Sequence, residues 1–266
     1  MIDRFGRLID YLRISVTDRC NLRCRYCMPS DGVPLLPPED ILRFEEIVEV
    51  ARVAADLGVS KVRLTGGEPL VRRGIETLVG MLAAIEGLTD LAMTTNAQLL
   101  SQHAAAMAAA GLRRVNVSLD AIDPLRYAAI TRGGDVRQAL AGIDAARQAG
   151  LNPVKLNCVV EPEGQGRDAR DVAAYARSEG MEVRFIQQMN LAAGCFSVVQ
   201  GGSGGDCARC NRLRLTSDGQ IRPCLFSDLS FGVRRLGAAE AIGRAVAEKP
   251  SSGSTCSNRP IHSIGG

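Results

Sequence analysis

Short apolar runs alternate with longer amphipathic segments along most of this chain. Six runs rich in β-branched and other apolar residues are predicted to form strands, over 11–16, 61–65, 90–95, 113–119, 153–160 and 182–187. The first helical segment has apolar residues three or four positions apart from Ile41 to Ala55, and Gly58 ends it. Further helices are predicted over 74–86, 98–110, 135–149 and 168–179, each ending near a glycine.

Strands and helices that alternate in this way are typical of βαβ units around a parallel sheet. Six such units predict an α/β fold with an open (βα)6 barrel, shorter than the closed form of eight units. In such barrels the chemistry lies at the carboxyl ends of the strands. The polar motifs CxxxCxxC, GGEP, TTN and SLD follow the first four predicted strands in that order. We therefore expect them to converge on one site.

The alternation stops after Asn190. The GGSGG run at 201–205 predicts a flexible connection with little capacity to pack. We divide the chain into a partial barrel at 1–190, a shortened glycine-rich connection at 191–206, a small cysteine-containing cap at 207–248 and a tail at 249–266 that ends in Gly-Gly.

Composition narrows the class of protein. The 266 residues are 46% hydrophobic with a formal net charge of +3, which allows a full core and argues against a nucleic-acid wrapper or a polybasic membrane binder. The first residues lack the apolar run of a signal peptide, and no stretch is long enough for a membrane span. Nine cysteines without an export signal favour metal binding in a reducing compartment. We expect a cytoplasmic metalloprotein.

Cys20, Cys24 and Cys27 follow the first predicted strand with the spacing CxxxCxxC. A four-iron cubane has four iron corners, so three thiolates leave one corner open. An open iron can chelate the amino and carboxylate groups of S-adenosylmethionine, and one electron then yields methionine and a 5′-deoxyadenosyl radical. A structural zinc site normally takes four protein ligands, and this spacing is not the usual CxxC pair. The motif therefore predicts an iron–sulfur cluster of a radical enzyme.

A second group, Cys207, Cys210 and Cys224, offers three further thiolates. A CxxC pair is also frequent in zinc ribbons, so zinc is the alternative to iron and sulfide at this site. Cys195 or Cys256 could supply a fourth ligand and close the site to substrate.

The chain resembles the radical S-adenosylmethionine superfamily and, within it, the GTP 3′,8-cyclases of molybdenum-cofactor biosynthesis, the MoaA family. The resemblance rests on the segments LRISVTDRCNLRCRYCMP, VRLTGGEPLVRRG, TTNAQLL, LRRVNVSLDAID, VRFIQQM, CxxCNRLRLTSDGQIRPCLF and NRPIHSIGG. It implies a lyase that converts GTP to 3′,8-cyclo-7,8-dihydro-GTP with S-adenosylmethionine and two 4Fe–4S clusters. In this family the second cluster binds the guanine.

The resemblance also implies the site residues. Both cysteine groups ligate iron, and the cofactor-contacting positions are Tyr26, Gly66, Gly67, Glu68, Thr95, Ser118, Lys155 and Met189. The substrate-contacting positions are Arg13, Lys61, Arg63, Arg184, Arg212 and Arg214. Cations suit a triphosphate because arginine forks match phosphate oxygens. The catalytic set is the first three cysteines, Arg13, and the terminal Gly265 and Gly266, which in this family reach back into the active site.

The implied partners are GTP as the small-molecule substrate and a reductant of ferredoxin or flavodoxin type, with no membrane and no nucleic acid, while a homodimer is left open. One alternative is a radical maturase that modifies a peptide or a related cofactor with an auxiliary cluster. The retained arginines and lysines and the terminal Gly-Gly argue against it. The other is a non-catalytic zinc module that binds a protein or nucleic acid, for which the modest charge and few aromatic residues are a poor fit.

Overall fold

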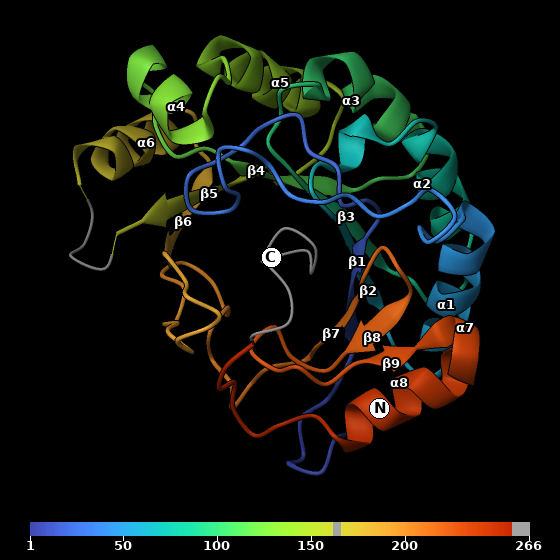
Figure 1. Cartoon of the computed structure of the whole chain (residues 1–266). Coiled ribbons are helices and arrows are strands. Elements are labelled where there is room, and N and C mark those ends of the chain that lie inside the picture. Colours follow the sequence, from blue (N-terminus) through green and yellow to red (C-terminus); the bar gives the residue numbers. More distant parts are fainter. Residues whose placement is uncertain (162–165, 257–266) are drawn as a thin grey trace.

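The computed structural model describes residues 1–161 and 166–256, so Gly265 and Gly266 lie outside the described residues. All six predicted strands are confirmed, as β1 (Tyr11–Ser15), β2 (Lys61–Thr65), β3 (Asp90–Thr95), β4 (Arg114–Ser118), β5 (Lys155–Val160) and β6 (Glu182–Gln187). Each pairs in parallel with the next. Figure 1 shows them as a curved sheet with the helices on its outer side.

The five predicted helical segments are confirmed as α1 (Phe44–Asp56), α2 (Ile75–Ala83), α3 (Leu100–Ala109), α5 (Val136–Gln148) and α6 (Arg167–Ser178). A short 3-10 helix, η1 (Pro69–Val71), follows β2, and α4 (Pro124–Thr131) was not predicted. The side chain of Asp123 starts α4 by accepting a hydrogen bond from the Arg126 N–H at 2.9 Å. Proline is also favoured at the first helical position. An Asp-Pro pair was therefore the signal for this helix.

The cysteine-containing segment extends the same sheet. β7 (Arg212–Leu215) pairs in parallel with β1, and β8 (Gln220–Arg222) and β9 (Phe231–Gly232) follow in antiparallel pairs. The strand order is β6-β5-β4-β3-β2-β1-β7-β8-β9, so within the described residues the sheet has two edges and the predicted open barrel is confirmed.

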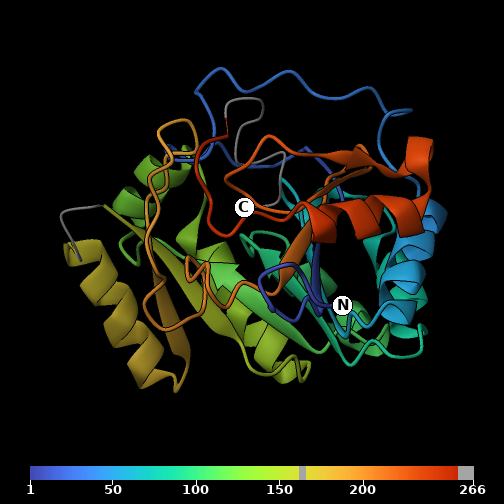
Figure 2. The ribbon, with the colours of Figure 1, turned by 90° about the horizontal axis from the view of Figure 1, so that it is seen from below.

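The last two helices cover the outside of this extension. α7 (Val233–Leu236) leads into α8 (Ala238–Ala247), and α8 packs against α1. Figure 2 shows α8 and α1 side by side. The blue segment between β1 and α1 runs across one end of the molecule. One hydrophobic core joins the barrel strands, α1 and α8. No helix in the described part of the chain has both the length and the apolar character that a membrane crossing requires.

The glycine-rich run at 201–205 lies against neighbouring backbone, although residues 201–203 are exposed. Gln200 forms an antiparallel bridge with Phe185 of β6. A Cβ at Gly205 would lie 2.0 Å from the carbonyl oxygen of Ser197. The absence of a side chain therefore lets this segment fold tightly on itself beside β6.

We expect Gly205→Ala to lower the free energy of unfolding by about 1–3 kcal/mol, because the left-handed backbone and the clash with the Ser197 carbonyl both oppose a side chain. Gly205 has a φ of +81°. Gly243→Ala is the matched control, since Gly243 lies inside α8 with nothing within 4 Å of an added Cβ. Alanine there should stabilise the helix by about 0.5–1 kcal/mol. Urea unfolding measures both, and an unchanged stability of Gly205→Ala would contradict the close packing.

Candidate active site

Cys20, Cys24 and Cys27 lie on the loop that follows β1, and all three line one cavity of about 230 Å³. The other walls come mainly from the carboxyl ends of neighbouring strands. They include Gly66, Gly67 and Glu68 after β2, Thr95 and Asn96 at β3, Ser118 at β4, and Met189 after β6. The predicted convergence of the four polar motifs on one site is therefore confirmed.

Gly66 and Gly67 let the backbone after β2 pack against the cysteine loop. A Cβ at Gly67 would lie 2.2 Å from the carbonyl oxygen of Arg19, and one at Gly66 would lie 2.6 Å from that of Thr17. The Gly67 N–H donates to the same Thr17 oxygen at 2.8 Å. The two glycines thus hold the loop in place directly before Cys20.

Glu68 is the buried acid of this cavity, with 1% of its surface exposed. It accepts hydrogen bonds from the Leu70 N–H at 3.1 Å, the Thr95 hydroxyl at 2.7 Å and the Asn96 N–H at 2.7 Å. Burial raises the pKa of Glu68 to about 7, although these three bonds favour the ionised form. A cation in the cavity would stabilise the ionised form further. The site is therefore suited to an ammonium group.

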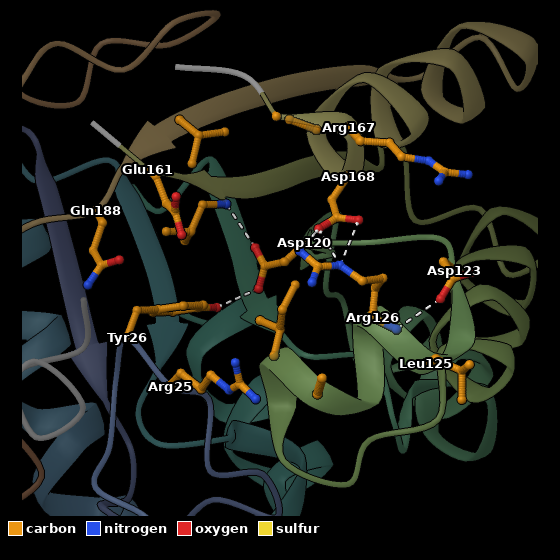
Figure 3. A pocket seen from close by; sticks show the side chains of 16 residues that line it. Arg25, Tyr26, Asp120, Asp123, Leu125, Arg126, Glu161, Arg167, Asp168 and Gln188 are labelled. Atoms are coloured by element: carbon orange, nitrogen blue, oxygen red, sulfur yellow. Dashed lines mark hydrogen bonds and ion pairs between the residues drawn. The ribbon is translucent and has the colours of Figure 1, made fainter. Parts of the chain in front are cut away.

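Tyr26, between the last two cysteines of the loop, is held by a buried carboxylate (Figure 3). Its hydroxyl donates to Asp120 at 2.8 Å, and the Val159 N–H donates to the other oxygen of Asp120 at 2.8 Å. Burial raises the pKa of Asp120 to about 6. These bonds join the cysteine loop to the ends of β4 and β5.

A larger cavity of about 830 Å³ is also lined by Tyr26. Tyr26, Val159 and Gln188 line both this cavity and the cysteine-lined one. Figure 3 shows the ion pair between Arg126 and Asp168, 2.7 Å long, on its wall.

Three arginines lie side by side on the inner face of the sheet. The strand register pairs Arg13 of β1 with Arg63 of β2 on one side and with Arg214 of β7 on the other. Each of them is less than a tenth exposed, at 9%, 7% and 8%. Burial is the main cause that lowers the pKa of Arg13 to about 9 and that of Arg214 to about 10, and neighbouring arginines add to it. Like charges placed opposite each other destabilise a sheet, so this row favours a bound anion.

Two more predicted cations lie near this row. With its amide oriented to accept, Asn116 of β4 takes hydrogen bonds from Arg63 at 2.8 Å and Arg184 at 3.1 Å. Arg212 lines the second cysteine cavity and donates to the Ser203 carbonyl at 3.0 Å. Both arginines therefore extend the positive charge across the inside of the barrel.

The structure places Lys61 and Lys155 away from the two cysteine cavities that the other predicted residues line or approach. Lys61 begins β2 and forms an ion pair of 2.8 Å with Asp10. Lys155 begins β5 and forms an ion pair of 2.5 Å with Glu182. Both side chains thus start from the amino ends of their strands, and neither lines the cysteine cavities.

Cys207, Cys210 and Cys224 line a second cavity, of about 160 Å³. Cys210 lies just before β7, and Cys224 follows β8, which is antiparallel to β7. This site is therefore at the amino end of β7, whereas the first cysteines follow the carboxyl end of the parallel strand β1. The two cavities adjoin, since both are lined by Arg13, Ile186 and Met189.

The two candidate fourth ligands do not line the second cavity. Cys195 is exposed. Cys256 is 2% exposed and accepts a hydrogen bond from the Arg222 guanidinium at 3.3 Å. Within the described residues the second cavity therefore offers three thiols, as the first one does.

The donor sets of the two cavities fit iron–sulfur clusters. Each cavity is lined by three cysteines. A cubane takes each thiolate on a different iron, which suits three cysteines spread around a cavity. The buried acceptor Glu68 adds negative charge for a cofactor with an amino group.

Comparison with known proteins identifies the family. The Radical SAM superfamily profile matches residues 14–176. The GTP 3′,8-cyclase of Moorella thermoacetica is 44% identical over 94% of this chain and 94% of its own length, and that of Thermodesulfovibrio yellowstonii is 39% identical over 100% of both. The chain belongs to the GTP 3′,8-cyclase family of the radical S-adenosylmethionine superfamily. S-adenosylmethionine and iron–sulfur clusters are therefore its cofactors.

The same comparisons show that relatives of this radical S-adenosylmethionine protein are longer. The alignment with the Moorella cyclase extends over 304 positions. Because this chain has 266 residues, the relative must carry residues that this chain lacks.

Solved structures agree on the fold. SuiB of Streptococcus suis bound to S-adenosylmethionine superposes with a TM-score of 0.64 over 91% of this chain, which spans 64% of SuiB. Native anSMEcpe with bound AdoMet gives a TM-score of 0.65 over 91% of this chain and 81% of the other. Both are 14% identical to this chain, so the likeness concerns the fold.

Sequence reasoning missed three residues of this region. Asp120 follows Ser118 in the SLD motif, and the motif's position at a strand end was the signal for it. Asn116 shares the inner face with Ser118 by the alternation of strand side chains. Lys249 lies after α8 in a segment without any motif, and only the structure places it beside the second cysteine group.

We expect Gly67→Ala to reduce the iron bound at the first cysteine site, because the added Cβ would displace the backbone next to Cys20. Gly80→Ala is the control, since an alanine there, inside α2, would meet its nearest neighbour at 4.0 Å. Iron and sulfide analysis after anaerobic reconstitution compares the two variants. Full iron content in Gly67→Ala would show that the contact does not position the loop.

Proposed function

We propose that this chain converts GTP to 3′,8-cyclo-7,8-dihydro-GTP, the first step of molybdenum-cofactor biosynthesis. The observation that carries the proposal is the row formed by Arg214, Arg13 and Arg63. Arg13 lines both of two adjoining cavities with three cysteines each, Arg214 lines the second cavity, and Arg63 is the neighbour of Arg13 on β2. A triphosphate brings the negative charge that offsets this row, and arginine forks match its oxygens.

The residues of the first cavity would hold the cofactors. Cys20, Cys24 and Cys27 would bind iron, and Glu68 would accept a hydrogen bond from the amino group of S-adenosylmethionine. When bound and reduced, this pair supplies the 5′-deoxyadenosyl radical that removes hydrogen from C3′ of the ribose. The remaining contacts are proposed for Gly66, Gly67, Tyr26, Thr95, Ser118 and Met189, which all line this cavity.

The residues between the cavities would orient the substrate. Arg13 and Met189 border both spaces, so a molecule between them meets the radical source on one side and the second cysteine group on the other. We assign the guanine to the site of Cys207, Cys210 and Cys224. The proposed role of Gly265 and Gly266 in turnover concerns residues outside the described ranges.

The proposal includes an external reductant of ferredoxin or flavodoxin type, because the cleavage of S-adenosylmethionine consumes an electron that the chain itself does not supply.

We further propose that 1–190 acts as the barrel, 191–206 as the connection, 207–248 as the cap that holds the second cluster and 249–266 as the tail. Described strands and helices from 212 to 247 form the sheet extension and its cover.

The proposed function is tested with anaerobically reconstituted, reduced protein, S-adenosylmethionine and GTP. The expected products are 5′-deoxyadenosine and the cyclised guanine nucleotide. If 5′-deoxyadenosine forms equally without GTP and no nucleotide product appears, the substrate assignment is wrong. A peptide-modifying enzyme would give that result.

We expect Arg63→Met to weaken GTP binding by about 10- to 100-fold, the loss of one charge-assisted contact to phosphate. The matched control is Arg113→Met, since Arg113 is exposed just before β4. Equilibrium binding of GTP and of S-adenosylmethionine measures both variants. The cofactor affinity of Arg63→Met should stay near that of the parent protein, and an unchanged GTP affinity would remove Arg63 from the site.

Binding of S-adenosylmethionine should depend on the ionisation of Glu68. Its pKa is raised to about 7, so the carboxylate is mostly protonated at pH 6 and mostly ionised at pH 8. Only the ionised carboxylate can accept N–H bonds from the amino group with both of its oxygens, so the affinity should fall about tenfold from the upper to the lower pH. Equilibrium binding at the two pH values measures it. Glu68→Gln should bind weakly and without this dependence, and a pH dependence that persists there would assign it to another group.

A further inference from the structure

Lys249 is a buried cation beside the second cysteine group. Its side chain is 1% exposed, although it lies two residues after the end of α8. The ammonium donates to the carbonyl oxygen of Arg212 at 2.7 Å and to that of Pro223 at 2.5 Å. Arg212 is two residues after Cys210, and Pro223 directly precedes Cys224. Lys249 therefore joins the two backbone segments that carry these cysteines.

The side chains of Cys210 and Cys224 lie near the Lys249 ammonium, and Cys210 forms a hydrogen bond with it. Arg7, the neighbouring buried cation, is different because Asp3 pairs with it at 2.6 Å. Among the described residues no carboxylate forms an ion pair with Lys249. A buried charge without an anion is costly, so the fold must supply one.

We propose that Lys249 is the counter-ion of the second iron–sulfur cluster, a positioning residue whose ammonium offsets the negative charge of the cluster and its three thiolates. The proposal rests on the second cluster site of the proposed function. A cation beside a cluster stabilises the reduced, more negative state and raises the midpoint potential. Lys249 thereby makes the second cluster easier to reduce than its three-thiolate ligand set alone would.

The competing role for Lys249 is purely structural, through its two hydrogen bonds to carbonyl oxygens. Such a role would stabilise the protein equally with and without the cluster. A counter-ion acts mainly when the cluster is present, because only then does the anion exist. The two roles therefore differ in the midpoint potential and in how stability depends on the cluster.

The test uses the full chain with Cys20→Ala, Cys24→Ala and Cys27→Ala, so that iron at the second site is observed without the first. Lys249→Met and Lys249→Arg are introduced into this parent. Arg244→Met is the matched control, since it removes one exposed positive charge from α8. The measurements are iron content, the midpoint potential by redox titration with electron paramagnetic resonance, and thermal unfolding before and after reconstitution.

Lys249→Met should shift the midpoint potential to more negative values, and it should destabilise the reconstituted protein more than the apoprotein. Lys249→Arg should keep the potential near that of the parent, and Arg244→Met should change neither quantity. An unchanged potential in Lys249→Met, an equal loss of stability in both forms, or an apoprotein that fails to fold would each overturn the proposal. A parent without iron at this site would instead refute the second cluster itself.

Discussion

The fold of this protein depends on the parallel pairing of β1 with both β2 and β7. β1 carries the first cysteine loop at its carboxyl end, and β7 begins next to Cys210. Because the strands are parallel, the two cysteine groups are held at opposite ends of a five-residue strand, which spans roughly 16 Å. The same register places Arg214, Arg13 and Arg63 in a row between them. One ladder thus sets both the separation of the two cysteine sites and the charge of the space between them.

The two cysteine sites differ in charge. The first is bordered by the carboxyl groups of Glu68 and Asp120, which burial holds at raised pKa values of about 7 and about 6. The second is lined by Arg212, Arg214 and Asp206, and Lys249 is bonded to the backbone beside its cysteines. Negative and apolar surroundings favour a strongly reducing cluster, and positive ones a cluster that accepts an electron more readily. The barrel therefore separates the two kinds of site along its strands, with the row of three arginines between them.

Much of the fold could be predicted because hydrophobic periodicity is local. The strands from β1 to β6 and five helices follow from the spacing of apolar residues, and α4 was missed because its eight residues give little periodicity. The packing of Gly205 against the Ser197 carbonyl could not be predicted, since glycine runs are compatible with both flexible and tightly folded backbone. The ion pairs of Lys61 and Lys155 also depend on which strands become neighbours, and no local pattern encodes that.

The sequence by itself determined the chemistry of this protein. Three thiols that leave one iron of a cubane open, a glycine-rich turn and a set of arginines are all properties of residue types and spacing. Only the tertiary structure decided how these groups act together. The β1–β7 pairing brings residues about two hundred positions apart into register, and folding buries Lys249 beside Cys210 and Cys224. Burial and long-range neighbours set the charge around each site, and both arise only when distant segments pack together.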